Sequence, residues 1–381
     1  MHTHLDADRS GGCWPNQRQM QLLHAALDDE DTAWHAWREW HSAGGMQLLP
    51  FDPSIVRLLP LVYLNLARYG AIDPSIAALE DTVQEARAHT LFVFSKCAGV
   101  LQKFAHSGLD PLVLKGAPLS IAYYRDIGAR PMSDMDVCIA REHVPAALRI
   151  LHDHGFRPRI PLPKLLTPAF FAVHHAWPFS ATSQGAPCEL DLHWRVLADY
   201  DDPQVDADLR HTARALPMLG VTVRSLDATG IFFHVCAHGV AWAPLPPLRW
   251  VADAVHILRS ADAVDWERLE QLTTRAGAAL AVADALAWLR RHFDAPIPDD
   301  VVERIARLPV STARRRLHRA NTERSHVFGR LPFHLARRAA LFPGLPLIEY
   351  LRIHYGAASD REALRLLLHK ALDRSTTMMH R

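Results

Sequence analysis

Residues 111–136 read PLVLKGAPLSIAYYRDIGARPMSDMD, and this stretch decides the fold that the sequence predicts. It begins with a short apolar strand, Pro111 to Leu114, and passes through a Lys115-Gly116 turn into a helix-like segment. A loop that contains Arg130 then leads into a second strand, which opens with Asp134 and Asp136. Strand, helix and strand in this order predict the start of an α+β core.

The second strand carries two acidic residues on one face. Residues two apart on a strand point to the same side, so the Cα atoms of Asp134 and Asp136 lie about 7 Å apart with both carboxylates on that side. Met135 and Val137 then face the other way, into a core. Two negative charges this close are unfavourable unless a cation lies between them. Mg²⁺, or Mn²⁺ in its place, is the ion that such a pair holds when the substrate is a nucleoside triphosphate.

A strictly alternating strand follows at residues 188–194, CELDLHW. Its apolar residues share one face, and Glu189, Asp191 and His193 share the other. We expect Asp191 to join Asp134 and Asp136 at one metal site, because three acids on two strands are typical of two-metal phosphoryl transfer. For Glu189 and His193 the sequence favours an exposed position on the same face, with a role beside the metal or the substrate as the alternative.

These segments together resemble a known family. Leu114-Lys115-Gly116, then Arg130-Pro131-Met132-x-Asp134-x-Asp136, then Glu189-x-Asp191-x-His193-Trp194 are similar to the uncharacterised nucleotidyltransferase family of the DNA polymerase β-like superfamily. The resemblance covers roughly Leu112 to Leu258. It implies that a nucleoside triphosphate such as ATP gives its nucleoside monophosphate to an acceptor hydroxyl, with release of pyrophosphate. A peptide, a protein, a sugar or an RNA end is a permitted acceptor.

The resemblance also implies a nucleotide-binding turn. The backbone N–H groups around Gly116 would approach the triphosphate at the helix start. Lys115 and Arg130 would meet phosphate, with solvated surface cations as the alternative. The wider superfamily has Gly-Ser or Gly-Gly here, whereas this chain has Lys115-Gly116-Ala117, so Ser120, Ser133 or Lys115 would have to replace the missing hydroxyl. The departure supports an alternative function, a catalytically inert nucleotide- or RNA-binding protein that keeps the fold.

Composition narrows the class of protein. A chain of 381 residues, 49% hydrophobic and 22% charged, suits a soluble protein with two or three domains. A net charge of +1 argues against a uniformly basic nucleic-acid binder. The five cysteines are scattered without a C-x-x-C, which favours reduced thiols and a cytoplasmic location. We see no signal-peptide pattern and no apolar run long enough for a bilayer, so we expect no membrane partner; the oligomeric state stays open.

Periodicity divides the chain into three parts. We expect an N-terminal helical region at 1–108, a nucleotidyltransferase core at 109–227 and a C-terminal helical domain at 228–381. The predicted fold class is therefore α+β, a small mixed β-sheet flanked by helical regions. Within the parts we expect, in chain order, a helix at 55–69, a long helix between Asp73-Pro74 and Gly108, a helix at 142–154, a hairpin of 174–181 with 187–194, and a last strand at 220–226.

Charged residues of the C-terminal part give two further expectations. Arg249 and Asp253 lie four apart and are expected to pair on one helix, with a contact to a base or ribose as the alternative, because Arg249, Trp250 and Asp253 resemble a segment of the same family. The segment from Arg314 to Arg338 holds eight arginines against one acid, Glu323, within predicted helices at 312–326 and 332–341, before another at 359–372. A solvated helix face is the default interpretation, and RNA is the alternative partner.

Overall fold

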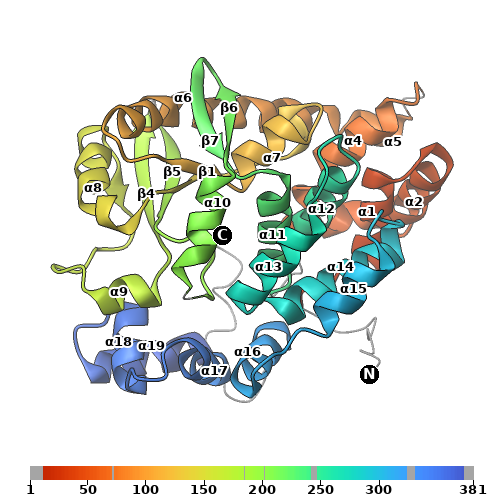
Figure 1. The fold of residues 1–381 in the computed structure, drawn as a ribbon. Coiled ribbons are helices and arrows are strands. Elements are labelled where there is room, and N and C mark those ends of the chain that lie inside the picture. Colours follow the sequence, from red (N-terminus) through yellow and green to blue (C-terminus); the bar gives the residue numbers. More distant parts are fainter. Residues whose placement is uncertain are drawn as a thin grey trace.

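The computed structural model describes residues 12–70, 73–183, 185–200, 202–241, 247–323 and 331–372. Within these residues the strands are β1 (Leu112–Leu114), β2 (Asp134–Cys138), β3 (Arg157–Pro158), β4 (Ala176–Ser183), β5 (Ala186–His193), β6 (Arg214–Met218) and β7 (Val221–Ser225). They form one sheet in the order β3-β4-β5-β2-β1-β7-β6 (Figure 1). The predicted α+β class with a mixed sheet is confirmed, and so is the hairpin, which is β4 and β5. Strand β6 was not predicted.

The centre of the sheet is β2. It pairs with β1 in the antiparallel and with β5 in the parallel direction. The register sets Asp136 opposite Leu114 on one side and opposite Asp191 on the other. Met135 and Val137 are fully buried on the opposite face, as the alternation predicts. The two acidic segments, which are more than fifty residues apart in the sequence, therefore become neighbours in the sheet.

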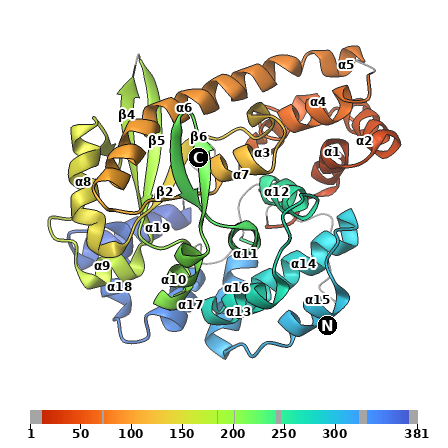
Figure 2. The same ribbon diagram turned by 45° about the horizontal axis from the view of Figure 1, so that its top comes forward.

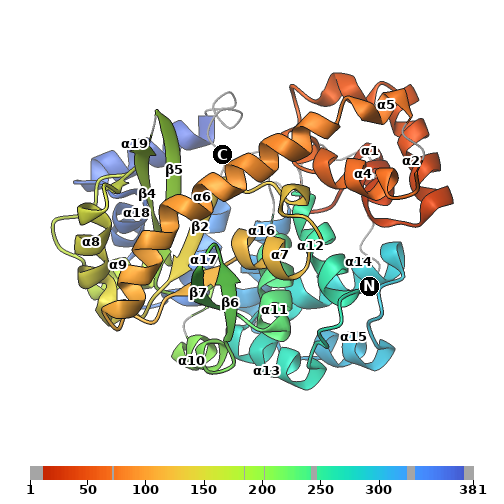
Figure 3. The same cartoon turned by 90° about the horizontal axis from the view of Figure 1, so that it is seen from above.

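One face of the sheet is covered by the long helix α6 (Glu80–His106) together with α8 (Val144–Asp153). Figure 3 shows α6 crossing the molecule from the N-terminal helices to α8. Its buried residues, among them Phe94, Cys97 and Phe104, share a hydrophobic cluster with Met135 and Val137. The predicted long helix is thus present, but it begins at Glu80. A separate short helix, α5 (Pro74–Ala77), precedes it, capped by the Asp73 side chain.

The N-terminal region consists of α1 (Gln17–Leu27), α2 (Glu30–Ser42), the 3-10 helix η1 (Gly45–Leu48), α3 (Pro53–Val56), α4 (Leu59–Ala67) and α5. The single helix expected at 55–69 is two helices in the structure. Pro60 explains the break, because proline lacks an N–H and clashes with the preceding turn, whereas it fits the first turn of a new helix. It occupies that position in α4.

The remaining helices are the short segments α7 (Gly116–Ala122), η2 (Ile127–Ala129), η3 (Arg141–His143) and α9 (Pro168–Val173), then α10 (Pro203–His211), α11 (Ala228–Gly239), α12 (Arg249–Leu258), α13 (Trp266–Ala276), α14 (Ala279–Phe293), α15 (Asp299–Ala306), α16 (Thr312–Thr322), α17 (Leu331–Leu341), α18 (Leu347–Tyr355) and α19 (Asp360–Leu372). Helices α9, α10 and α18 were not predicted, and residues 324–326 of the expected 312–326 helix lie outside the described residues.

The flanking helices pack together. Figure 2 shows α1 beside α12, and one hydrophobic core includes residues of α1, α2 and α4 together with residues of α11 to α15. Leu112 and Leu114 of β1 belong to the same core. Hydrophobic packing therefore crosses residues 108 and 227, and the three-domain division stays a prediction. No helix among the described residues has the length and apolar character needed to span a membrane.

Candidate active site

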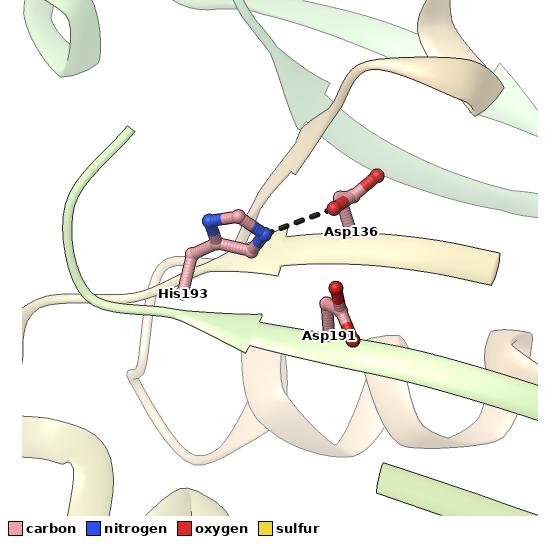
Figure 4. A group of neighbouring side chains, drawn as sticks. All are labelled: Asp136, Asp191 and His193. Atoms are coloured by element: carbon pink, nitrogen blue, oxygen red, sulfur yellow. Dashed lines mark hydrogen bonds and ion pairs between the residues drawn. The ribbon is translucent and has the colours of Figure 1, made fainter. Parts of the chain in front are cut away.

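Asp136, Asp191 and His193 converge on one face of the sheet, near the carboxyl ends of β2 and β5. Each offers one ligand atom, and the three atoms all lie within 4.8 Å of one another. Figure 4 shows the Asp191 side chain rising from β5 toward Asp136, with His193 reaching Asp136 from the end of the strand. Asp136 and Asp191 are direct neighbours across two parallel strands. The expected meeting of acids from these two segments is therefore present.

Asp136 is the most enclosed acid of this group, with 3% of its surface exposed. Its Oδ1 accepts a hydrogen bond from Lys115 Nζ at 2.6 Å and one from His193 Nε2 at 2.9 Å. Burial alone would raise the pKa of this carboxyl, but the Lys115 charge and the His193 hydrogen bond outweigh burial and hold the pKa well below its usual range. Asp136 is therefore a carboxylate at neutral pH.

Asp191 has the opposite electrostatic balance. Burial, followed by repulsion from Asp136 and Asp134, raises the pKa of its carboxyl to about 6. The same acids act on the ammonium of Lys115: burial would lower its pKa, yet attraction by Asp136, with smaller contributions from Asp134 and Asp191, raises it. Several carboxylates therefore lie close together at this point of the sheet, and their negative charge favours binding of a cation.

The Lys115-Gly116 turn is strained. Lys115 has φ 50° and ψ −112°, a conformation that non-glycine residues rarely adopt. Such strain clusters at functional sites. At Gly116 a Cβ would lie 3.2 Å from both Arg130 and Met132, so a side chain there would force these neighbours to shift by a few tenths of an ångström. The turn carries the Lys115 ammonium to Asp136 instead of leaving it in solvent.

Asp134 and Ser133 stand at the outer edge of the group. Asp134 is half-buried, lies opposite Glu189 and accepts a hydrogen bond from Ser133 Oγ at 3.2 Å. Glu189 is half-buried and pairs with Arg159 at 2.7 Å. Ser120 is fully buried and donates to Ala117 O. Of the residues considered as replacements for the missing hydroxyl, only Ser133 and Lys115 lie at the acidic group.

Arg130 lies in a buried ion pair. Its Nε and one terminal nitrogen donate to Asp253 of α12 at 2.6 and 2.8 Å, and Tyr124 donates to the same carboxylate. The expected Arg249–Asp253 pair is therefore wrong: Arg249 donates to Pro131 O. Tertiary packing turns Asp253 toward the loop before β2, which spacing along one helix does not reveal. The contacts of Arg130 and Tyr124 with Asp253, and of Arg249 with Pro131 O, join α12 to the segment that leads into β2.

His193 was expected to be exposed, and the structure corrects this. It is 1% exposed, and its ring also lies edge-on to that of His175, with centroids 5.3 Å apart. Burial, and then the His193 charge, lower the pKa of His175. The alternation within residues 188–194 identified the face correctly. The alternation did not indicate that this face of β5 is buried at the carboxyl end of the strand, where His193 lies.

Three arginines of the basic segment 314–338 make structural contacts. Arg314 is half-buried and donates to Asp199 O. Arg337 is buried, pairs with Asp199 at 2.8 Å and also donates to Val173 O. Arg338 donates to two carbonyl oxygens. Arg315, Arg316 and Arg319 lie on exposed positions of α16, and Arg324 and Arg330 lie outside the described residues. Only part of the expected solvated face remains available to an RNA partner.

Sequence comparison identifies the class of protein to which this site belongs. A model of the family described as "Uncharacterised nucleotidyltransferase" matches residues 56–294, more than half of the 381-residue chain. The chain belongs to that family, which makes a nucleotide triphosphate its expected substrate class. The family expected from residues 112–258 is thus confirmed over a longer segment. No curated protein and no solved structure matches the chain significantly.

The donor atoms fit a divalent cation. Mg²⁺ takes carboxylate oxygens, and Mn²⁺ takes both these oxygens and imidazole nitrogen. Asp136 and Asp191 supply oxygens from facing positions, and burial together with repulsion from Asp136 and Asp134 raises the pKa of Asp191. The site therefore has the chemistry of a divalent metal site, with Asp136, Asp191 and His193 as its candidate residues.

Proposed function

We propose that this protein is a metal-dependent nucleotidyltransferase that moves a nucleoside monophosphate from a nucleoside triphosphate to an acceptor hydroxyl and releases pyrophosphate. The observation that carries the proposal is the facing pair of Asp136 and Asp191, with Asp134 two residues before Asp136 on the same strand face. The mixed sheet that holds them supports membership of the DNA polymerase β-like superfamily.

Asp134, Asp136 and Asp191 would hold Mg²⁺ or Mn²⁺ in this proposal. A bound cation of this kind neutralises phosphate charge and lowers the pKa of an attacking hydroxyl. Asp191 would hold the hydroxyl in line with the α-phosphorus. The hydroxyl oxygen would bond to that phosphorus, the bond between the phosphorus and the pyrophosphate oxygen would break, and the hydroxyl proton would leave to solvent. The protein does little covalent chemistry of its own and mainly positions charged groups.

The nucleotide would be held around the β1–α7 turn. Lys115 is charged, near the acids and partly exposed, with 24% of its side chain accessible. If a metal cation binds Asp136, Lys115 no longer has to neutralise that carboxylate alone. Its ammonium is then the group best placed to contact a phosphate. Gly116 and Ser133 lie next to the same group. Arg130 is held by Asp253, so we assign its contribution to the shape of the turn and not to a phosphate contact.

The acceptor is a hydroxyl of a peptide, a protein, a sugar or an RNA end, and ATP is the first nucleotide to test. Within the described residues all five cysteines are free and buried, which supports a cytoplasmic protein without disulfides.

The Lys115–Asp136 ion pair favours one alternative. The Lys115 ammonium, 2.6 Å from Asp136, neutralises that carboxylate without any metal ion, so the same arrangement would be stable in a protein that has no catalytic activity. The alternative function is therefore a catalytically inert nucleotide- or RNA-binding protein that keeps the fold.

The test is label transfer. The protein is incubated with Mg²⁺ and each nucleoside triphosphate carrying label at the α-phosphate, together with peptides, proteins, sugars and RNA of a cell extract. We expect labelled acceptor and pyrophosphate from the wild type, and none from Asp134→Ala, Asp136→Ala or Asp191→Ala proteins that remain folded by circular dichroism. Full activity in the three variants would refute the assignment.

A further inference from the structure

His193 lies beside Asp136 and Asp191 although the sequence favoured an exposed position for it, and its hydrogen bonds indicate its role at the site. The imidazole Nε2 lies 2.9 Å from Oδ1 of Asp136. The same Oδ1 also accepts a hydrogen bond from the Lys115 ammonium at 2.6 Å, so it belongs to an ion-paired carboxylate, which accepts hydrogen bonds and has no proton to donate. Nε2 must therefore carry the proton and donate it.

A protonated ring nitrogen has no lone pair to offer a metal ion. The other nitrogen, Nδ1, is buried and has no hydrogen-bond partner among the described residues. Figure 4 shows that Nδ1 points away from both carboxylates, while Nε2 points at Asp136. Neither nitrogen is thus arranged as a ligand for a cation held by Asp136.

The two donors to Asp136 share one oxygen. Lys115 Nζ and His193 Nε2 both reach Oδ1. Within the described chain Oδ2 accepts no hydrogen bond, and in Figure 4 it points away from the imidazole. A carboxylate held firmly through one oxygen presents the other in a fixed direction. Hydrogen bonds of this kind orient metal ligands and tune their affinity.

We propose that His193 is a positioning residue: its Nε2–H holds Oδ1 of Asp136 so that Oδ2 is presented to a divalent cation, and the imidazole itself does not bind the metal. The cation site would then contain oxygen ligands alone from this group, which suits Mg²⁺ as well as Mn²⁺. This inference rests on the proposed function, because it concerns the same cation site.

Two spectroscopic measurements on the wild-type protein test the proposal. In metal-free protein labelled with ¹⁵N-histidine, we expect the NMR signals of His193 to show a protonated Nε2. After addition of Mn²⁺ alone, pulsed electron paramagnetic resonance should show bound Mn²⁺ without coupling to imidazole nitrogen. An unprotonated Nε2, or an imidazole coupling that disappears in the His193→Gln protein, would overturn the inference and leave the nucleotidyltransferase proposal intact. Unchanged signals of free Mn²⁺ would overturn both.

A pair of variants separates orientation from ligation. Glutamine at position 193 keeps an N–H donor near the place of Nε2, whereas alanine keeps none. We expect His193→Gln to bind Mn²⁺ within about threefold of the wild type and His193→Ala to bind roughly tenfold more weakly or worse, the usual cost of removing such a partner. If glutamine and alanine weaken Mn²⁺ binding equally, His193 does not act through its donor.

Discussion

The side chain of Lys115 is the clearest single-residue consequence of this structure. The sequence allowed it to meet phosphate or to remain on the surface, and the structure shows it bonded to Asp136. The positive φ angle of Lys115, directly after β1, turns its side chain toward Asp136. An ammonium there supplies part of the charge that a divalent cation would bring.

Replacing Lys115 tests this competition. Lys115→Met should bind Mn²⁺ more tightly in the absence of nucleotide, by about tenfold, because a positive charge beside Asp136 no longer repels the ion. The same variant should be less stable than the wild type without metal, since a buried carboxylate loses its charged partner. Calorimetric titration measures the affinity, and Lys103→Met, at an exposed position of α6, is the matched control. Unchanged or weaker binding would show that Lys115 does not occupy the cation's position.

At the scale of elements, the contacts between α12 and the segment before β2 include one buried ion pair, Arg130 with Asp253. Removing one partner leaves the other charged and buried, which costs roughly 3–5 kcal/mol. We therefore expect Asp253→Asn to lower the free energy of unfolding strongly in urea titration. The double variant Arg130→Met with Asp253→Leu should recover much of the loss, because no isolated charge remains.

The control for this prediction is an exposed pair. Arg290 and Asp299 also form an ion pair, but both side chains are exposed, so Arg290→Met should cost less than about 1 kcal/mol. Equal losses for Asp253→Asn and Arg290→Met would mean that the buried pair does not hold the elements together.

The sequence predicted the elements of the site better than their connections. Alternation in DMD and in ELDLHW identified the acidic faces of β2 and β5, because side-chain direction on a strand depends only on local geometry. That these strands meet was inferred from the three-acid pattern of two-metal phosphoryl transfer and from the family resemblance, since strand pairing is non-local and no local pattern fixes it. Burial of His193 and the turn of Asp253 away from Arg249 depend on packing between distant segments, and no local pattern contains that information.

At the scale of the whole molecule, buried histidines make stability depend on pH. Burial lowers the pKa of His174 to about 4, and burial also lowers that of His256 to about 4. His174 contacts α18 through Ile353 O, and His256 lies against Tyr124, so both rings link separate parts of the chain.

Acid should therefore destabilise the fold. The unfolded chain binds these protons near its ordinary histidine pKa of 6.5, well before the folded protein does. Stability is thus complete above pH 6.5 and falls as the pH decreases toward 4, by on the order of 3 kcal/mol for each histidine. Urea unfolding at several pH values measures this, and His256→Gln should flatten the curve. A free energy of unfolding that stays constant from pH 7 to pH 4.5 would contradict the prediction.

Both helical flanks pack into one core that includes Leu112 and Leu114 of β1, the strand beside β2, which carries two of the proposed metal ligands. The measurement that tests the site most directly is isothermal titration of the protein with each nucleoside triphosphate, with and without Mg²⁺. We predict Mg²⁺-dependent binding of at least one nucleotide by the wild type and by Glu189→Gln, which alters a neighbouring acid of β5 that pairs with Arg159. Asp136→Asn and Asp191→Asn should lose it. Nucleotide binding that does not depend on Mg²⁺, or that survives in both aspartate variants, would contradict this account.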